Sequence, residues 1–290
     1  MAALPTRSSF TLHAAAAAVA ALAFSGASMA QLAAANAPAP AFTVSGNATL
    51  ATDYVWRGLS QTWGKPALQA TLEAAHSSGF YVGFFGSNVA PQFIPNANLE
   101  LDGFGGYRGK SGDVSYDLNA VYVGYPGSNY NKASFVPAFD SESTASVEVY
   151  ANLGYKWFNL RYGRFVTKFF GWNVNNSGVG VFNALQPQAG LTGSSKGSQN
   201  LELSGLFEVA DGLTLKGLAG RQMMPNSVDI SWTYYSLAAT KSLPDNWSAG
   251  LALWGTSGPK AFKQYGSLTN NGQTSTPSRN TVVLSVSKGF

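Results

Sequence analysis

Cysteine is absent from this chain of 290 residues, and histidine occurs only twice. Without cysteine the chain has no disulfide scaffold, no thiolate metal site and no cysteine nucleophile. His13 lies in a leader segment described below, so only His76 remains for the mature protein, and a single histidine does not build a typical zinc site. No stretch shows the spacing of a calcium-binding EF-hand loop. We therefore expect no metal or other cofactor.

Charged residues are scarce as well, at 11% of the chain, whereas a soluble domain carries about 25%. Aromatic residues reach 13%, and glycine occurs 32 times. Beyond the first thirty residues no apolar run approaches the roughly 18 residues that a membrane-spanning helix needs. If the mature chain contacts lipid, it must do so as closed β-structure, because every backbone polar group needs a partner there.

The first thirty residues have the features of a secretory signal peptide. Arg7 precedes an apolar run over residues 10–24, and Ser28-Met29-Ala30 supplies small residues suited to cleavage. The run is short for a membrane anchor, which favours a cleaved leader over residues 1–30. A short segment rich in alanine and proline follows at residues 31–41. Removing Arg7 lowers the formal net charge of +4 by one and suggests no nucleic-acid partner.

From residue 42 onward, apolar and polar residues alternate in segments of about ten. Phe42 and Val44, for example, alternate with Thr43 and Ser45. This dyad pattern is typical of transmembrane barrel strands. The predicted strands are residues 42–54, 68–74, 80–89, 99–107, 114–125, 145–155, 158–165, 201–209, 213–222, 229–241, 247–254 and 281–290. We therefore predict an all-β protein, a transmembrane antiparallel up-and-down β-barrel of twelve strands over residues 42–290.

The connections alternate between short and long, as they do in outer-membrane barrels. Short links are predicted at residues 76–79, 108–113, 156–157, 210–212 and 242–246, and long ones at 55–66, 126–144, 166–200 and 255–280. Two links on the long-loop side, at 90–97 and 223–228, are shorter. This alternation predicts periplasmic termini and extracellular long loops. The segment 166–200 could fold inward as a constriction or plug. It carries apolar residues that suffice to pack either against a wall or against each other, namely Phe169, Phe170, Trp172, Val181 and Phe182.

Aromatic residues at strand ends predict two girdles at the membrane interfaces. One girdle would comprise Phe42, Phe80, Tyr107, Phe158, Trp247 and Phe290, and the other Tyr54, Tyr122 and Tyr162. Such regular placement favours a barrel over a soluble β-sandwich. A terminal Phe290 after alternating apolar residues resembles the signal that the outer-membrane assembly machinery recognises, which makes that machinery an expected partner.

Several motifs along the chain point to one family. The end of the first predicted strand and the loop that follows contain Asp53-Tyr54-x-Trp56-Arg57-Gly58-x-Ser60-Gln61-Thr62. Further motifs are Gly79-Phe80-Tyr81-x-Gly83, Glu100-x-Asp102 and Glu148-Val149-Tyr150. They resemble the TorF family of porin-like proteins, and the resemblance covers most of the mature chain. It implies a barrel in the outer membrane of a Gram-negative bacterium and says little about any substrate.

Charged residues at the strand positions that alternate with the lipid-facing ones are candidates to line a pore. These are Asp53, Arg57, Glu73, Glu100, Asp102, Asp117, Glu148, Arg161, Glu202 and Lys216. Carboxylates in a pore favour cations over anions. The set predicts a porin-like channel for passive diffusion of small solutes that prefers cations or neutral molecules. Alternatively, these charges pair across a filled, non-conducting barrel that serves as an adhesin or a structural envelope protein.

Two further expectations concern individual charges. Asp53 and Arg57 either form a structural ion pair that fixes the first loop or contact the solute. Outer-membrane lipid and lipopolysaccharide are expected partners. Lysines in the long loops either pair with lipopolysaccharide phosphates or are simply solvated. They are Lys65, Lys132, Lys168, Lys196, Lys260 and Lys263.

Catalysis finds little support. His76 stands beside Ser77 and Ser78, with Glu73 three residues earlier, so the residue types of a hydrolase triad are present. Neighbours in one tight turn seldom converge on a substrate, however, and no oxyanion site is evident. We expect no enzyme, and a hydrolase is the weaker alternative.

Overall fold

The computed structural model describes residues 41–135, 137–257, 260–269 and 273–290. The predicted signal peptide and almost all of the alanine- and proline-rich segment at 31–41 lie outside these residues. Among the described residues, no helix is long and apolar enough to cross a membrane.

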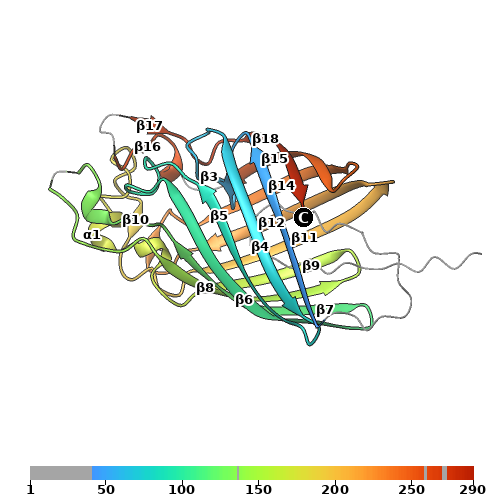
Figure 1. Cartoon of the computed structure of the whole chain (residues 1–290). Coiled ribbons are helices and arrows are strands. Elements are labelled where there is room, and N and C mark those ends of the chain that lie inside the picture. The colour runs from blue at the N-terminus through green and yellow to red at the C-terminus, as the bar shows by residue number, and fades with distance from the viewer. Residues whose placement is uncertain (1–40, 136, 258–259, 270–272) are drawn as a thin grey trace, which may run out of the picture.

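Twelve long antiparallel strands form a closed barrel, as predicted (Figure 1). They are β1 (Phe42–Ala51), β4 (Ala67–His76), β5 (Phe80–Asn88), β6 (Leu99–Ser111), β7 (Val114–Gly124), β8 (Ser146–Tyr155), β9 (Phe158–Phe165), β11 (Gln199–Ala210), β12 (Leu213–Met223), β14 (Trp232–Ser242), β15 (Trp247–Ser257) and β18 (Thr281–Gly289). Each strand pairs with its neighbours along the chain, and β1 closes the ring by pairing with β18.

The remaining elements are short and lie in the long connections. They are β2 (Val55–Trp56), β3 (Leu59–Ser60), η1 (Tyr130–Lys132), η2 (Phe169–Gly171), α1 (Val174–Ser177), β10 (Gly190–Leu191), β13 (Ser227–Val228), η3 (Lys260–Phe262), β16 (Tyr265–Gly266) and β17 (Thr274–Ser275). In Figure 1, α1, β10, β16 and β17 gather at the left end of the barrel. We call this the loop end, and the opposite end, where two to four residues join the strands, the turn end.

The alternation of residue types places apolar side chains on the outside of the barrel. On β1, Leu50 is 61% exposed and its neighbour Thr49 is 1% exposed; on β5, Phe84 is 68% exposed and Phe85 is 3% exposed. An apolar exterior around a closed ring of backbone hydrogen bonds is suited to lipid, since no backbone edge is left in the hydrocarbon layer. The barrel is therefore of the transmembrane type.

Aromatic residues surround the turn end on the outer surface, as predicted. Phe42, Phe80, Tyr107, Phe158, Trp247 and Phe290 are all exposed there. Tyr122 and Tyr162 are exposed on the outer surface nearer the loop end. Tyr54 is a correction: it is 3% exposed and its hydroxyl donates to Glu100 Oε1 at 2.8 Å inside the barrel. β1 ends at Ala51, so the outward parity assumed for Tyr54 does not extend that far.

Candidate functional site

The inner surface of the barrel has two unlike sides. The charged wall comprises the interior faces of β4 to β11 and carries Glu73, Glu100, Asp102, Arg108, Asp117, Glu148, Arg161 and Glu202. The small-residue wall is the part of the interior faces of β14, β15 and β18 that carries Ser236, Ala238, Thr240, Gly250, Ala252, Val283 and Ser285. Toward the loop end the same faces carry the larger side chains of Trp232, Tyr234 and Trp254. On these three strands, none of the described interior-facing residues is charged.

A row of polar residues crosses five neighbouring strands of the charged wall. The strand register places Arg108 opposite Asp117, Asp117 opposite Asn152, Asn152 opposite Arg161, and Arg161 opposite Glu202. Arg161 Nε donates to Asn152 Oδ1 at 2.9 Å, and its Nη1 lies 4.0 Å from Glu202 Oε1. Directly opposed residues of unlike charge stabilise a sheet, so this row ties the strands together.

Arg108 was not among the predicted interior residues, because the sequence pattern assigned it to a turn. β6 continues to Ser111, which puts Arg108 on the inner face with the same parity as Glu100 and Asp102. There it forms a salt bridge with Glu73 and lies 4.4 Å above the Tyr81 ring. Because Arg108 continues the alternation of Glu100 and Asp102, that pattern would have identified it as an interior residue.

The first long loop enters the barrel as a hairpin. β2 pairs with β3 so that Arg57 and Gly58 form its two-residue turn, both with positive φ (47° and 78°). This geometry is that of the type I′ turn, which favours glycine in the second position. A Cβ on Gly58 would lie 2.4 Å from Thr256 Cγ2. The Trp232 indole also donates to the Arg57 carbonyl at 2.8 Å, so the turn is held tightly against β14 and β15.

Arg57 at the tip of this hairpin is buried inside the barrel. Its Nη2 donates to Glu148 Oε1 and Oε2 at 2.9 and 3.0 Å and to the Tyr150 hydroxyl at 3.2 Å, and its Nη1 donates to Gln222 Oε1 at 2.6 Å. Burial by itself lowers the pKa of Arg57, but the Glu148 charge raises it above its ordinary value. Arg57 therefore links the hairpin to β8 and β12 as a permanent cation.

Asp53 and Arg57 do not form the ion pair that we considered from the sequence. Asp53 Oδ1 instead accepts hydrogen bonds from Ser60 Oγ and Thr62 Oγ1, both at 2.7 Å. Burial raises the pKa of Asp53, although these two hydrogen bonds oppose the shift. Both charged residues fix the first loop, but through separate partners: Asp53 holds the hairpin stem together, and Arg57 attaches its tip to Glu148.

The other acidic residues of the charged wall are held mainly by neutral partners. Asp117 accepts from the Tyr81 hydroxyl at 2.9 Å and from Asn119 at 2.6 Å. Glu202 accepts from the Tyr234 hydroxyl at 2.9 Å. Asp102 is buried, and its Oδ1 has no hydrogen-bond partner among the described residues. The interior therefore holds more carboxyl groups than basic groups.

Aromatic side chains cover the hairpin at the loop end. We call this group the aromatic cap; it comprises Trp56, Phe165, Phe169, Phe170, Trp172, Phe182, Trp232, Phe262 and Tyr265. Phe169 is central, with ring centroids 4.6 Å from Phe170, 4.7 Å from Phe165 and 5.0 Å from Trp172. The aromatic residues of segment 166–200 thus pack both on each other and on the barrel wall, the two arrangements left open by the sequence.

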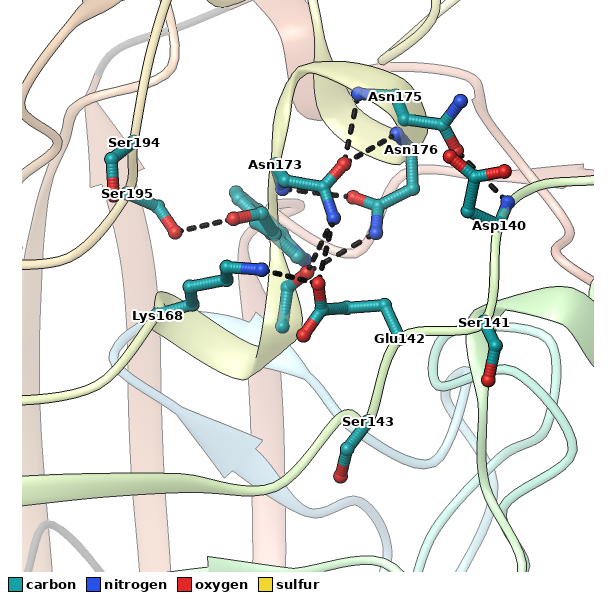
Figure 2. Close-up of polar contacts among 12 residues, drawn as sticks. Asp140, Ser141, Glu142, Ser143, Lys168, Asn173, Asn175, Asn176, Ser194 and Ser195 are labelled. Atoms are coloured by element: carbon teal, nitrogen blue, oxygen red, sulfur yellow. Dashed lines mark hydrogen bonds and ion pairs between the residues drawn. The ribbon is translucent and has the colours of Figure 1, made fainter.

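Polar contacts hold the outer side of this cap together (Figure 2). Glu142, in the connection between β7 and β8, accepts from Lys168 and from Asn173 Nδ2 at 3.1 Å. The Asn173 side chain caps α1 by accepting from the backbone N–H groups of Asn175 and Asn176 at 2.8 and 3.2 Å. The web therefore ties the segment between β9 and β11 to its neighbouring loop.

All ten predicted pore-lining residues have interior positions in the barrel or its first loop. Lys216, on β12, is the member nearest the small-residue wall, because it stands opposite Ala238 of β14. Sequence reasoning missed the neutral partners of these charges, namely Tyr54, Tyr81, Tyr150, Gln222 and Tyr234. Whether the ten residues line a conducting pore stays a prediction.

The triad residue types near His76 are not brought together. His76 Nδ1 lies 2.7 Å from Ser78 Oγ in an exposed turn, whereas Glu73 forms its salt bridge with Arg108 inside the barrel. Within the described ranges, no group of three or more histidine or acidic residues is placed to hold a metal ion.

Residues 33–290 match the model of a bacterial family of unknown function, Gcw_chp. The chain belongs to this family. The match does not test the resemblance to the TorF family specifically. No curated protein matches the chain.

Among solved structures, the chain is similar to outer-membrane channels of low sequence identity. A KdgM porin is 8% identical at a TM-score of 0.47, covering 85% of this chain and 99% of the other. A NanC porin is 8% identical at a TM-score of 0.45, with 84% and 98% covered. An outer membrane channel from Pseudomonas putida F1 is 14% identical at a TM-score of 0.43, with 87% and 97% covered.

Proposed function

We propose that this protein is a porin-like channel of the outer membrane for passive diffusion of small solutes, with a preference for cations or neutral molecules. The observation that carries the proposal is the composition of the interior. The acidic residues there are Asp53, Glu73, Glu100, Asp102, Asp117, Glu148 and Glu202, and the basic ones are Arg57, Arg108, Arg161 and Lys216. Carboxylates in excess lower the energy of cations in a pore and raise that of anions.

The energetic cost of this interior supports a role in transport. Each buried charge costs several kcal/mol of desolvation, and apolar residues of similar size often replace buried ion pairs without loss of stability. A barrel that served only as an anchor could therefore replace these paired charges with apolar residues. A charged wall opposite a wall of small side chains is what a narrow aqueous passage requires.

Conductance of the refolded protein in planar bilayers tests the proposal. We expect discrete current steps, and across a salt gradient of about tenfold we expect a reversal potential that indicates cation preference. Salt screens exposed charges, so the preference should weaken as the salt concentration rises. The absence of any current steps would overturn the proposal.

The aromatic cap favours a second candidate function. It closes the loop end over the hairpin, and a barrel whose mouth stayed closed would serve as an adhesin or a structural envelope protein. The bilayer experiment separates the two functions, since only a channel conducts. Binding of intact cells or matrix by the long loops, without conductance, would support this second candidate.

The proposed location assigns a side to each end of the barrel. Short turns and both terminal strand ends would face the periplasm, and the loop end would face outward. Phe290 would contact the assembly machinery, and loop lysines such as Lys65 and Lys196 would contact lipopolysaccharide phosphates. Lys168 and Lys132 are already engaged by Glu142 and by the Gly127 carbonyl. The resemblance to TorF porins is in keeping with this location.

A further inference from the structure

A cavity of about 60 Å³ lies between the hairpin stem and the small-residue wall. Its lining includes Asp53 and Gln69 on one side and Ala238, Ala252 and Ser285 on the other. This is more than the minimum space that a water molecule needs, so the cavity has room for water or one small ion. The cavity exists because the three strands facing the stem carry small side chains.

Two buried polar atoms belong to residues that line this cavity and have no partner among the described residues. They are Asp53 Oδ2 and Gln69 Nε2, on side chains that are 4% and 5% exposed. Buried polar atoms are nearly always hydrogen-bonded, so each requires a partner. Asp53 Oδ2 accepts and Gln69 Nε2 donates, so a water molecule between them would satisfy both atoms, and the carboxylate would attract a cation that enters the cavity.

Asp53 is also the only charged residue among those that line the cavity. Lys216 stands on the far side of the small-residue wall, opposite Ala238. Ala238 stands opposite Ala252, and Ala252 opposite Val283. The uncharged interior faces of β14, β15 and β18 therefore separate a carboxylate from an ammonium group. An ion beside this wall would meet Asp53 directly.

We propose that ions pass the hairpin along the small-residue wall, and that Asp53 is the residue that determines cation specificity. This inference rests on the proposed channel function and names its path and its constriction. The Arg57 side chain reaches Glu148 and Gln222 across the interior. The turn itself packs against the loop-end parts of β14 and β15, beyond the small-residue wall. The stem, with Asp53, is left facing the wall of small side chains.

Ion selectivity of point variants tests the role of Asp53. In Asp53→Asn we expect the cation-to-anion permeability ratio to fall at least about twofold toward unity, whereas Lys216→Gln should raise it by a smaller factor. Asp140→Asn, at an exposed loop carboxylate, is the matched control and should leave the ratio unchanged. An unchanged ratio in Asp53→Asn overturns the specificity assignment.

Cadmium block tests the path, because the chain has no native cysteine. In Ala252→Cys we expect micromolar Cd²⁺ to reduce the conductance at least about tenfold, since thiolates bind this soft cation, and a chelator should restore it. Ala120→Cys, on the outward face of β7, is the matched control and should be insensitive. A conducting Ala252→Cys channel that ignores Cd²⁺ places the path elsewhere.

The pH dependence of selectivity gives a third readout. Burial raises the pKa of Asp53, while Ser60, Thr62, the Tyr54 backbone and the Arg279 charge act against the shift. Cation preference should therefore decline as the pH falls through a value above the ordinary range near 4, and this step should be missing in Asp53→Asn. The same step in both proteins would assign it to another group.

Failure of this inference and failure of the proposed function give different results. If wild-type protein conducts and Asp53→Asn and Ala252→Cys behave as wild type, only the path and its specificity residue are wrong. If wild-type protein shows no current steps, the channel itself is wrong, and the inference fails with it.

Discussion

The charged wall and the small-residue wall are parts of one ring of strands, yet they solve different physical problems. On the charged wall, side chains such as Glu148 and Arg161 are long and engaged with partners, and Glu148 also holds Arg57 of the hairpin. On the other wall, alanine, glycine and serine leave space beside the stem. The contrast indicates that changes on the first wall should affect stability, and changes on the second should affect conductance.

Arg57→Met should have the largest effect on stability. It leaves Glu148 buried without its cation, and breaking a buried pair in this way costs about 3–5 kcal/mol. Urea unfolding of the protein in detergent micelles would measure the loss. Arg57→Met with Glu148→Gln should recover part of it, because the unpaired charge is then gone. A loss below about 1 kcal/mol would show that the charged wall does not hold the hairpin.

Tyr234→Phe should have a smaller effect on the same property. Its hydroxyl is fully buried, donates to Glu202 and accepts from Asn200 at 2.8 Å. A hydrogen bond to a charged group contributes about 1.5–3 kcal/mol, so the free energy of unfolding should fall by about 2 kcal/mol. The same urea titration measures it, and ion selectivity should change little. A large change in selectivity without loss of stability would contradict the assignment of stability to one wall and conductance to the other.

Asn173→Ala tests a position outside both walls. The substitution removes the cap of α1 and one hydrogen bond to Glu142, which should cost about 1 kcal/mol locally. A loss of about 1 kcal/mol makes local opening about fivefold more frequent, so trypsin cleavage after Lys168 should become about fivefold faster. Global unfolding in urea should be unchanged. A fall in global stability would mean that the loop web supports the barrel itself.

Ala252→Val should have the smallest effect on stability. The cost of about 1–3 kcal/mol for overfilling applies to well-packed cores, and this residue lines a cavity of about 60 Å³. We expect a change below about 1 kcal/mol together with a clear fall in single-channel conductance. A strongly destabilised protein with normal conductance would reverse the comparison between the two walls.

The strands could be predicted from the sequence because the alternation of apolar and polar residues involves only residues adjacent in the chain. Every long strand was predicted within a few residues, and Glu100, Asp102 and Glu148 were placed on the inner face by parity alone. Arg108 was missed because β6 extends beyond the segment that lipid alone would require. The error concerned strand length and not strand pattern.

The partners of Arg57 could not be predicted in the same way. Its contact with Gln222 joins residues 165 positions apart, and it depends on how deeply a loop enters the barrel. The hairpin around Arg57 and Gly58 is visible only in the structure, and no periodic signal in the sequence gives its direction. Tyr54 was misplaced for the same reason, since the chain leaves the wall after Ala51. Cross-barrel contacts depend on tertiary packing, which local patterns do not encode.

The junction between β1 and β18 has a consequence for how the barrel is made. Its register joins Asn47–Ala51 to Ser285–Gly289, whereas β1 and β4 are in register along all of β1. Thr49 and Ser287 are 238 positions apart, so this junction carries the largest loop-closure cost. Long-range strand pairing is slow, and ring closure should be the last step of assembly. Until then, β1 presents an open edge on which a foreign strand could be added.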